Sequence, residues 1–144
     1  MKYKILLLSG IFWLMMIPFV KGQQFHSPDK SAIQKHIHLL ETTWNTLGIH
    51  TFCDSIFADS NITFIWGNVI CYTQGAAGNL LLKNYKVKPE IKLRIEGIRV
   101  HGNFSSALVY WEEMKGGKTR RKKVISLLYE KVSGNWQLIQ VQTS

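Results

Sequence analysis

Few carboxyl groups in this chain are placed to act on a substrate. Glu112 and Glu113 are adjacent within a segment of alternating apolar residues, so on a strand they point to opposite faces. They cannot act together as an acid–base pair on one substrate. Asp59 and Glu96 are therefore the candidate acid–base residues. For Asp59, which follows a predicted helix, the alternative role is that of a turn residue bonded to the backbone.

A larger group of aromatic and amide side chains is suited to lining a cavity for a small molecule. Aromatic rings supply apolar surface, and hydroxyl and amide groups supply a few directional hydrogen bonds. Taken singly, each of these residues also has an ordinary role in a core or on a surface. The candidate pocket residues are Trp66, Tyr72, Tyr85, Trp111, Tyr129, Gln140 and Gln142.

Motifs for cofactors and metals are absent from the sequence. It contains no Gly-x-Gly-x-x-Gly, no phosphate-binding loop, no His-Glu-x-x-His and no Gly-x-Ser-x-Gly. His36 and His38 are two residues apart, and on a helix such residues do not face each other. We expect neither a metal site nor a cofactor.

The last segment, Val124 to Ser144, positions most of the polar candidates. Two β-branched and aromatic runs flank a Ser-Gly-Asn turn, which predicts a hairpin. If the turn has an even number of residues, cross-strand partners have opposite parity. One face then grades from apolar to amide-rich, as at the edge of a cavity; the alternative is that the amides simply meet solvent. This face is predicted to carry Ile125, Leu127, Tyr129, Trp136, Leu138, Gln140 and Gln142.

Helical patterns precede the long strands, and a short strand pair, Ile62 to Trp66 and Val69 to Tyr72, is predicted before the last of the helices. Ser27-Pro28 is suited to a helix start, and Gly48 to its end. Shorter helices are predicted from Ile49 to about Ala58 and from about Ala76 to Lys86. A change of phase at Gly97 within an alternating run predicts a β-bulge. The first helix should bury an apolar stripe of Ile33, Ile37, Leu40, Trp44 and Leu47. Helices followed by a long antiparallel sheet predict an α+β domain.

The C-terminal segment also carries a family resemblance. Its pattern of Leu127-Leu128-Tyr129, Lys131, Gly134, Trp136 and Leu138-Ile139, closing on Thr143-Ser144, resembles the final hairpin of SnoaL-like domains. These domains belong to the nuclear transport factor 2-like superfamily, whose fold is also described as cystatin-like. The resemblance is strongest over Val124 to Ser144 and extends more weakly back to about Ile33.

The resemblance implies a cone-shaped roll, in which a curved antiparallel sheet wraps around N-terminal helices and leaves a pocket at its open end. It also implies a homodimer formed through the sheet. Relatives often carry acids near the position of Asp59. Many have a histidine two residues before the final serine, where this chain has Gln142. A glutamine amide does not titrate, so proton transfer by that histidine has no counterpart here.

The N-terminus has the features of a secretory signal peptide. Lys2 and Lys4 precede an apolar run of sixteen residues, Ile5 to Val20, and Gly22 is a plausible cleavage point. We expect residues 1–22 to be a signal peptide and residues 23–144 the domain, with an exported, periplasmic or secreted product. Retention of the segment as a membrane anchor is the alternative, although a spanning helix needs about 20 residues. After cleavage we expect no stable membrane span.

Charge and cysteine content leave two questions open. The chain has a net charge of +9, and Arg120-Arg121-Lys122-Lys123 is its densest basic cluster. Such a cluster can contact nucleic acid or an anionic surface. An exported protein rarely meets nucleic acid, so we favour a solvated hairpin and expect no nucleic-acid partner.

Cys53 and Cys71 could form a disulfide in an oxidising compartment or remain buried thiols.

These observations favour an exported domain that binds a small molecule, hydrophobic or of mixed polarity, in an aromatic-lined cavity. The first alternative is a cyclase or isomerase with Asp59 or Glu96 as base and Tyr129 as hydrogen-bond donor. The second alternative is a dimerisation domain without a ligand. A cavity containing a buried carboxylate would favour the enzyme, and a cavity filled by side chains would favour the purely structural role.

Overall fold

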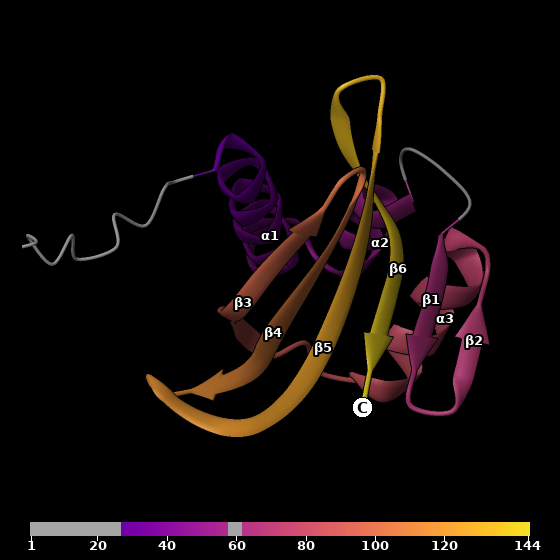
Figure 1. Cartoon of the computed structure of the whole chain (residues 1–144). Coiled ribbons are helices and arrows are strands. Elements are labelled where there is room, and N and C mark those ends of the chain that lie inside the picture. Colours follow the sequence, from indigo (N-terminus) through magenta and orange to yellow (C-terminus); the bar gives the residue numbers. More distant parts are fainter. Residues whose placement is uncertain (1–26, 58–61) are drawn as a thin grey trace, which may run out of the picture.

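The computed structural model describes residues 27–57 and 62–144. The predicted signal peptide, residues 1–22, and the candidate base Asp59 lie outside these ranges. Three helices and six strands follow one another as shown in Figure 1. They are α1 (Pro28–Leu47), α2 (Ile49–Phe57), β1 (Thr63–Trp66), β2 (Val69–Cys71), α3 (Gln74–Asn84), β3 (Glu90–His101), β4 (Phe104–Lys115), β5 (Lys118–Val132) and β6 (Asn135–Thr143).

The strands form a single sheet, which confirms the predicted α+β class. Their order is β2-β1-β6-β5-β4-β3. All neighbours are antiparallel except β1 and β6, which run parallel, so the sheet is mixed rather than wholly antiparallel. The parallel pair arises because the C-terminal strand returns to the centre of the sheet, between β1 and β5.

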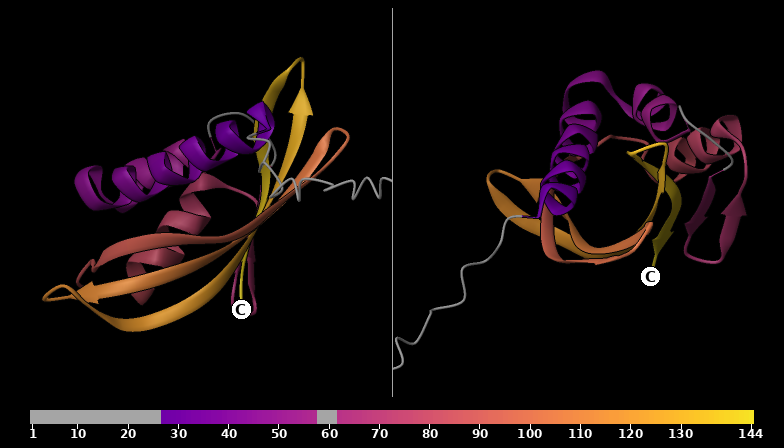
Figure 2. Two further views of the ribbon diagram at one scale, coloured as in Figure 1. Left: turned by 60° about the vertical axis from the view of Figure 1, so that its left-hand side comes forward. Right: turned by 45° about the horizontal axis from the view of Figure 1, so that its top comes forward.

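Three bulges interrupt the ladders of the four long strands. In β3 the register shifts between Ile95 and Gly97, which confirms the predicted bulge and leaves Glu96 without a partner. Arg120 in β5 and Ile139 in β6 are the extra residues of the other two. Bulges bend a strand and increase its twist. The sheet accordingly curls around the helices as an open cone (Figure 2).

Helix α1 lies across the concave face of the sheet (Figure 2). Four members of its predicted stripe, Ile33, Ile37, Leu40 and Trp44, are buried. The prediction is wrong for Leu47, which is 64% exposed, because the last turn of α1 ends beyond the apolar surface that covers the preceding turns. In the described part of the chain, no helix is both long enough and apolar enough to cross a bilayer.

Polar residues of α1 cover the free edge of β3. The Asn45 side chain donates to the carbonyl oxygen of Ile91 at 2.8 Å and accepts from the Ile91 N–H at 2.9 Å. A carboxylate oxygen of Glu41 accepts from the N–H of Leu93 at 2.5 Å. An uncovered sheet edge would offer these backbone groups to another chain. Helix α1 therefore closes the cone on the side of β3 as well as filling it.

The other end of α1 is fixed to the β5–β6 hairpin. Asp29 in its first turn accepts from the Lys131 ammonium at 2.7 Å and from the Trp136 indole N–H at 3.0 Å. These two hydrogen bonds lower the pKa of Asp29 below its ordinary value. Trp136 itself is half-buried and packs against the core. The helix is thus anchored at Asp29 and again, through Asn45, near its C-terminus.

Replacement of Asn45 by alanine is expected to destabilise the fold by about 1–3 kcal/mol. The substitution leaves the N–H and carbonyl of Ile91 without their partners in a half-buried position, and unsatisfied backbone groups carry a cost of this size. Chemical denaturation of Asn45→Ala checks the value. Thr46→Ala is the control, since Thr46 is exposed and bonds only within its own helix. Equal stability of the two variants would contradict the edge-sealing role.

Candidate functional site

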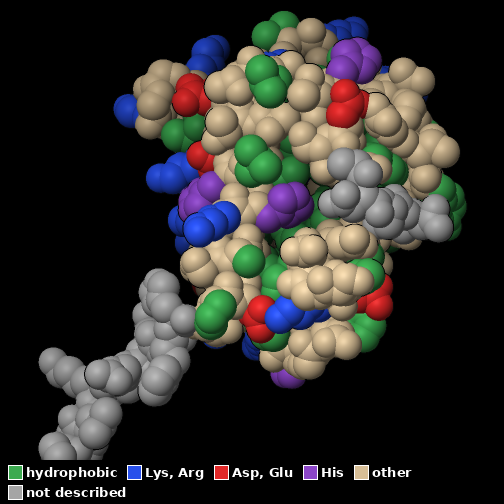
Figure 3. Space-filling model, turned by 90° about the horizontal axis from the view of Figure 1, so that it is seen from above, with side chains coloured by type: hydrophobic (Ala, Val, Ile, Leu, Met, Phe, Trp, Pro, Cys, Tyr) green, Lys and Arg blue, Asp and Glu red, His purple; other side chains and the backbone are tan. Residues whose placement is uncertain are grey.

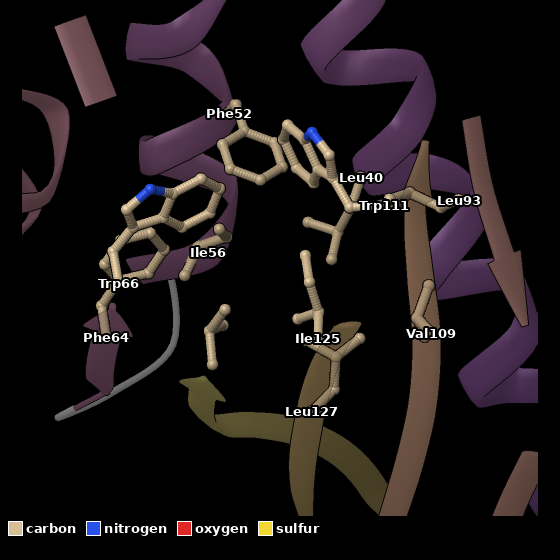
Figure 4. Close-up of a pocket in the computed structure, with 11 residues that line it drawn as sticks. Leu40, Phe52, Ile56, Phe64, Trp66, Leu93, Val109, Trp111, Ile125 and Leu127 are labelled. Atoms are coloured by element: carbon tan, nitrogen blue, oxygen red, sulfur yellow. The ribbon is translucent and has the colours of Figure 1, made fainter. Parts of the chain in front are cut away.

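An apolar cavity lies between the helices and the inner face of the sheet (Figure 4). Eleven apolar and aromatic side chains from α1, α2 and five strands line it. Phe52, Trp66 and Trp111 lie along one side, and Ile125 and Leu127 reach toward it from β5. The centre of a water-sized sphere can occupy only about 20 Å³ of it. That is room for about one water molecule, so in this conformation side chains fill most of the space.

A layer of aromatic rings forms one wall of this cavity. The ring centroids of Trp66 and Trp111 are 5.6 Å apart at a steep interplanar angle of 83°. Tyr85 lies beside both, at 6.1 Å from Trp66 and 6.4 Å from Trp111. Trp44 contacts Trp111 edge-on at 4.7 Å. Such edge-to-face and offset pairs are favourable and hold each ring in one orientation.

Polar groups gather against the aromatic wall, and we call them the Glu113 cluster: Tyr85, Glu113 and Lys123. The Tyr85 hydroxyl donates to Glu113 Oε1 at 2.9 Å, and the Lys123 ammonium donates to the Tyr85 oxygen at 2.9 Å. Lys123 Nζ is also 3.7 Å from Glu113 Oε1 and 4.5 Å from the centre of the Trp66 ring. An acid, a hydroxyl and an amine therefore meet at one edge of the aromatic wall.

Burial sets the electrostatics of this cluster. It raises the pKa of the Tyr85 hydroxyl, and the hydrogen bond to Glu113 raises it further. It also lowers the pKa of Lys123, an effect that the nearby Glu113 carboxylate opposes. Glu113 is only 7% exposed, which is rare for a carboxylate unless it is paired. Arg121 adds a second cation at 4.0 Å from Glu113.

The alternation of side chains along β4 and its pairing with β5 place the members of the Glu113 cluster that lie on strands. Trp111 and Glu113 are two residues apart on β4 and share its inner face. Their partners across the ladder are Lys123 and Arg121 of β5. Tyr85 is the residue that caps the end of α3, with its N–H bonded to the carbonyl of Leu81. The cluster therefore combines two neighbouring strands with the end of a helix that is distant in sequence.

Sequence reasoning did not find Glu113. It separated the two adjacent acids correctly, since Glu113 faces inward and Glu112 faces outward toward Arg94. The signal that identifies Glu113 is its spacing from Trp111, because both must lie on the same face of the strand. What the sequence could not supply was the proximity of Tyr85 and Lys123, which depends on tertiary packing.

Five of the seven predicted pocket residues fall into three groups. Trp66 and Trp111 line the cavity, and Tyr85 closes the aromatic wall beside them. Tyr129 is fully buried, with its hydroxyl 3.1 Å from Nδ1 of His36. Tyr72 is 69% exposed and faces solvent.

The placement of Gln140 and Gln142 on the Tyr129 face is wrong. The predicted parity holds near the turn, where Tyr129 lies opposite Leu138. The bulge at Ile139 then moves each later residue to the other face. Val141 and Thr143 are consequently buried, whereas Gln142 is exposed and bonds to Gln140 on the outer surface.

Glu96 does not reach the interior either. It is the extra residue of the β3 bulge, and its exposed carboxylate pairs with Arg94 at 3.1 Å. Asp59, the other candidate base, lies outside the described residues. Over residues 27–57 and 62–144, no three His, Cys, Asp or Glu side chains are grouped so that they could hold a metal ion.

The two cysteines are buried thiols in this structure. Burial raises the pKa of Cys53 to about 12 and also raises the pKa of Cys71. A thiol must lose its proton to act as a nucleophile or as a metal ligand. Neither cysteine is therefore suited to nucleophilic chemistry at neutral pH.

The architecture matches that of solved nuclear transport factor 2-like proteins. A protein of unknown function from Shewanella oneidensis MR-1, described as NTF-2 like, aligns with a TM-score of 0.65 and 18% identity, covering 81% of this chain and 98% of its own. A Nostoc punctiforme domain of unknown function with a cystatin-like fold also gives 0.65 and 18%, covering 81% and 76%. An NTF2-like protein from Novosphingobium aromaticivorans gives 0.60 and 10%, covering 80% of each chain.

These similarities confirm the expected fold. No protein-family profile matches the sequence, and no curated protein matches it. At 10–18% identity the solved structures establish a nuclear transport factor 2-like, or cystatin-like, fold and nothing about chemistry. The function must therefore be argued from the side chains of this chain.

Replacement of Tyr129 by phenylalanine is expected to make the alkaline loss of stability shallower. Burial raises the pKa of the Tyr129 hydroxyl, so its contribution is complete below the unfolded-state pKa of about 10 and is lost as the pH rises above it. The stability difference between wild type and Tyr129→Phe should fall by about 1.4 kcal/mol per pH unit above pH ~10. Urea denaturation across this range measures it, and parallel pH curves would contradict the assignment.

Proposed function

We propose that this chain is an exported domain that binds a small, mostly apolar molecule through its aromatic-lined cavity. The observation that carries the proposal is the position of the Glu113 cluster against the aromatic wall of that cavity. Trp66 lines the cavity and lies under the Lys123 ammonium. A ligand with an apolar body and a polar end could place its body in the aromatic-lined cavity and its polar end against the Glu113 cluster.

The energetic cost of the Glu113 cluster supports a role beyond folding. Removing a carboxylate and an ammonium from water is unfavourable, and their attraction often fails to recover that loss. Apolar residues of similar size on the inner faces of β4 and β5 would make an equally stable or more stable core. Polar groups that are retained at such a position are candidates for ligand recognition.

The ligand must displace side chains in order to enter. Sites for drug-sized ligands usually measure about 300–1,000 Å³, far more than the cavity offers in this conformation. Tyr85 is the side chain we expect to move, because it stands at the end of α3 and is held by hydrogen bonds to Glu113 and Lys123. A ligand that replaces these hydrogen bonds with its own polar end would release the ring and expose the aromatic wall.

A cyclase or isomerase is the second candidate function. The observation that favours it is the buried Glu113 carboxylate 2.9 Å from the Tyr85 hydroxyl, an arrangement that places a base beside a hydrogen-bond donor. In that role Glu113 takes the part first considered for Asp59 and Glu96, and Tyr85 the part considered for Tyr129. The two functions differ in whether the bound molecule is converted to a product or is released unchanged.

Replacement of Glu113 by glutamine is expected to weaken ligand binding about tenfold or more. The substitution preserves shape but removes the charge, and hydrogen bonds to charged groups are worth about 1.5–3 kcal/mol. The ligand is first identified by native mass spectrometry of protein purified from the producing cell, and its Kd is then measured by calorimetry.

Glu112→Gln is the matched control, because Glu112 is adjacent in sequence but faces outward. Equal affinity of the two variants, together with no difference in any conversion of the ligand, would exclude the Glu113 cluster from the binding site. If Glu113→Gln binds normally and only conversion of the ligand is lost, the enzyme is the correct function.

We also propose that two copies associate through the outer face of the sheet. Leu108 and Phe104 are 40% and 49% exposed there. A groove of about 370 Å³ lies beside Leu108, bordered by Arg99, Ser106 and Ser126. Unbroken alternation along β6 would place Val141 on this face, but the bulge at Ile139 turns it inward. An exposed apolar group on a curved sheet is suited to a symmetric contact with a second copy.

The chain is accordingly expected to be dimeric, and Leu108→Arg to be monomeric, at micromolar concentration. The new charge would be buried unpaired in the contact, which is strongly unfavourable. Light scattering coupled to size exclusion measures both masses. Leu39→Arg is the control, since Leu39 is 56% exposed on α1, away from the sheet's outer face. A monomeric wild type would refute the association.

A further inference from the structure

Three segments that are distant in sequence meet at the open end of the cone, and we call this region the rim: the C-terminus of α1, residues 83–90 and residues 115–122. The Lys88 ammonium donates to the carbonyl oxygens of Trp44 and Asn45 at 2.8 and 3.2 Å, which fixes the second segment to the first. Glu90 pairs with Met114, next to the third segment. The left panel of Figure 2 shows all three at the same end of the molecule.

The rim is strongly basic. Residues 83–90 and 115–122 contain eight lysines and arginines and one acid, Glu90. Seven of the basic side chains are exposed, and the half-buried exception is Lys88. In Figure 3, where the molecule is seen from above, acidic, basic and histidine side chains are interspersed over the surface that faces the viewer. The exposed basic side chains are Lys83, Lys86, Lys115, Lys118, Arg120, Arg121 and Lys122.

Exposed aliphatic side chains stand among these cations. Val87 is 86% exposed, the highest value for a large hydrophobic residue in the described chain, and it lies between Lys86 and Lys88. Leu47, at the end of α1, is 64% exposed, and Leu82 beside Lys83 is 39% exposed. Basic residues interleaved with protruding aliphatic residues are typical of surfaces that insert shallowly into anionic bilayers.

We propose that the rim docks on bilayers that contain anionic phospholipids. The cations match the negative surface potential of such a bilayer. Val87 and Leu47 can reach the boundary between head groups and acyl chains, where apolar surface is favoured. Nucleic acid is the less suitable partner, because the phosphate backbone offers no apolar layer to receive these two side chains. This docking is independent of the proposed ligand, although it would turn the open end of the cone toward the lipid.

A site-specific fluorescent probe tests this orientation in the full chain. Val87→Cys carries an environment-sensitive dye at the rim, and Val132→Cys carries it at the β5–β6 hairpin, near the start of α1. The native cysteines are buried, so labelling of the folded protein is confined to the new sites. With vesicles of phosphatidylglycerol and phosphatidylcholine, only the dye at position 87 should shift to shorter wavelength. A shift at position 132 alone, or equal shifts at both positions, would show that the protein does not dock through the rim and would overturn the proposal.

Charge and apolar contributions are then separated by substitution. Lys118→Glu with Arg120→Glu should lower vesicle partitioning about tenfold or more, whereas Lys30→Glu with Lys35→Glu, the same charge change on α1, should not. Binding should also weaken at high salt and be absent with pure phosphatidylcholine.

Val87→Ser should reduce vesicle binding without changing the affinity for duplex DNA. Tighter binding to duplex DNA than to vesicles would assign the rim to nucleic acid and overturn the proposal.

Discussion

The packing of α1 into the concave face of the sheet is the contact on which the rest of the structure depends. Ile33, Ile37, Leu40 and Trp44 supply the apolar surface that the curled strands enclose. The same helix satisfies the free edge of β3 through Asn45 and Glu41 and is tied to the last hairpin through Asp29. The apolar inner face of such a curved sheet must be buried against another element, and α1 is that element.

The curvature depends in turn on three single-residue bulges, and these also decide which side chains enter the cone. Each bulge adds one residue to one strand, so every later side chain on that strand changes face. The bulge at Glu96 places that acid in solvent, and the bulge at Ile139 turns Gln140 and Gln142 outward. In their place Val141 and Thr143 face the core, which makes that region of the interior more apolar than alternation alone predicts.

The interior is largely apolar, and two of the polar arrangements within it differ in character. Midway along α1, the Tyr129 hydroxyl is paired with His36, and the Tyr129 side chain is fully buried. Near its C-terminus, Tyr85, Glu113 and Lys123 border an aromatic wall with a small cavity behind it. The first arrangement satisfies one buried hydroxyl. The second concentrates an acid, a hydroxyl and an amine where a ligand can reach them if Tyr85 moves, which is why the proposed function rests there.

The sequence by itself determined the fold class, the order of elements, the Gly97 bulge and most of the buried stripe of α1. These depend on local spacing, which period-2 and period-3.6 patterns record directly. It also separated Glu112 from Glu113, since adjacent strand residues must face opposite ways. The tertiary structure alone decided which residues of β6 after Leu138 face the interior. It also brought Tyr85, at the end of α3, to Glu113 and Lys123. The Ile139 bulge leaves little periodic signal because only four residues of β6 follow it, whereas the alternation on both sides of Gly97 is long enough to show the change of phase. Contacts between distant elements are set by the packing of the whole sheet around α1.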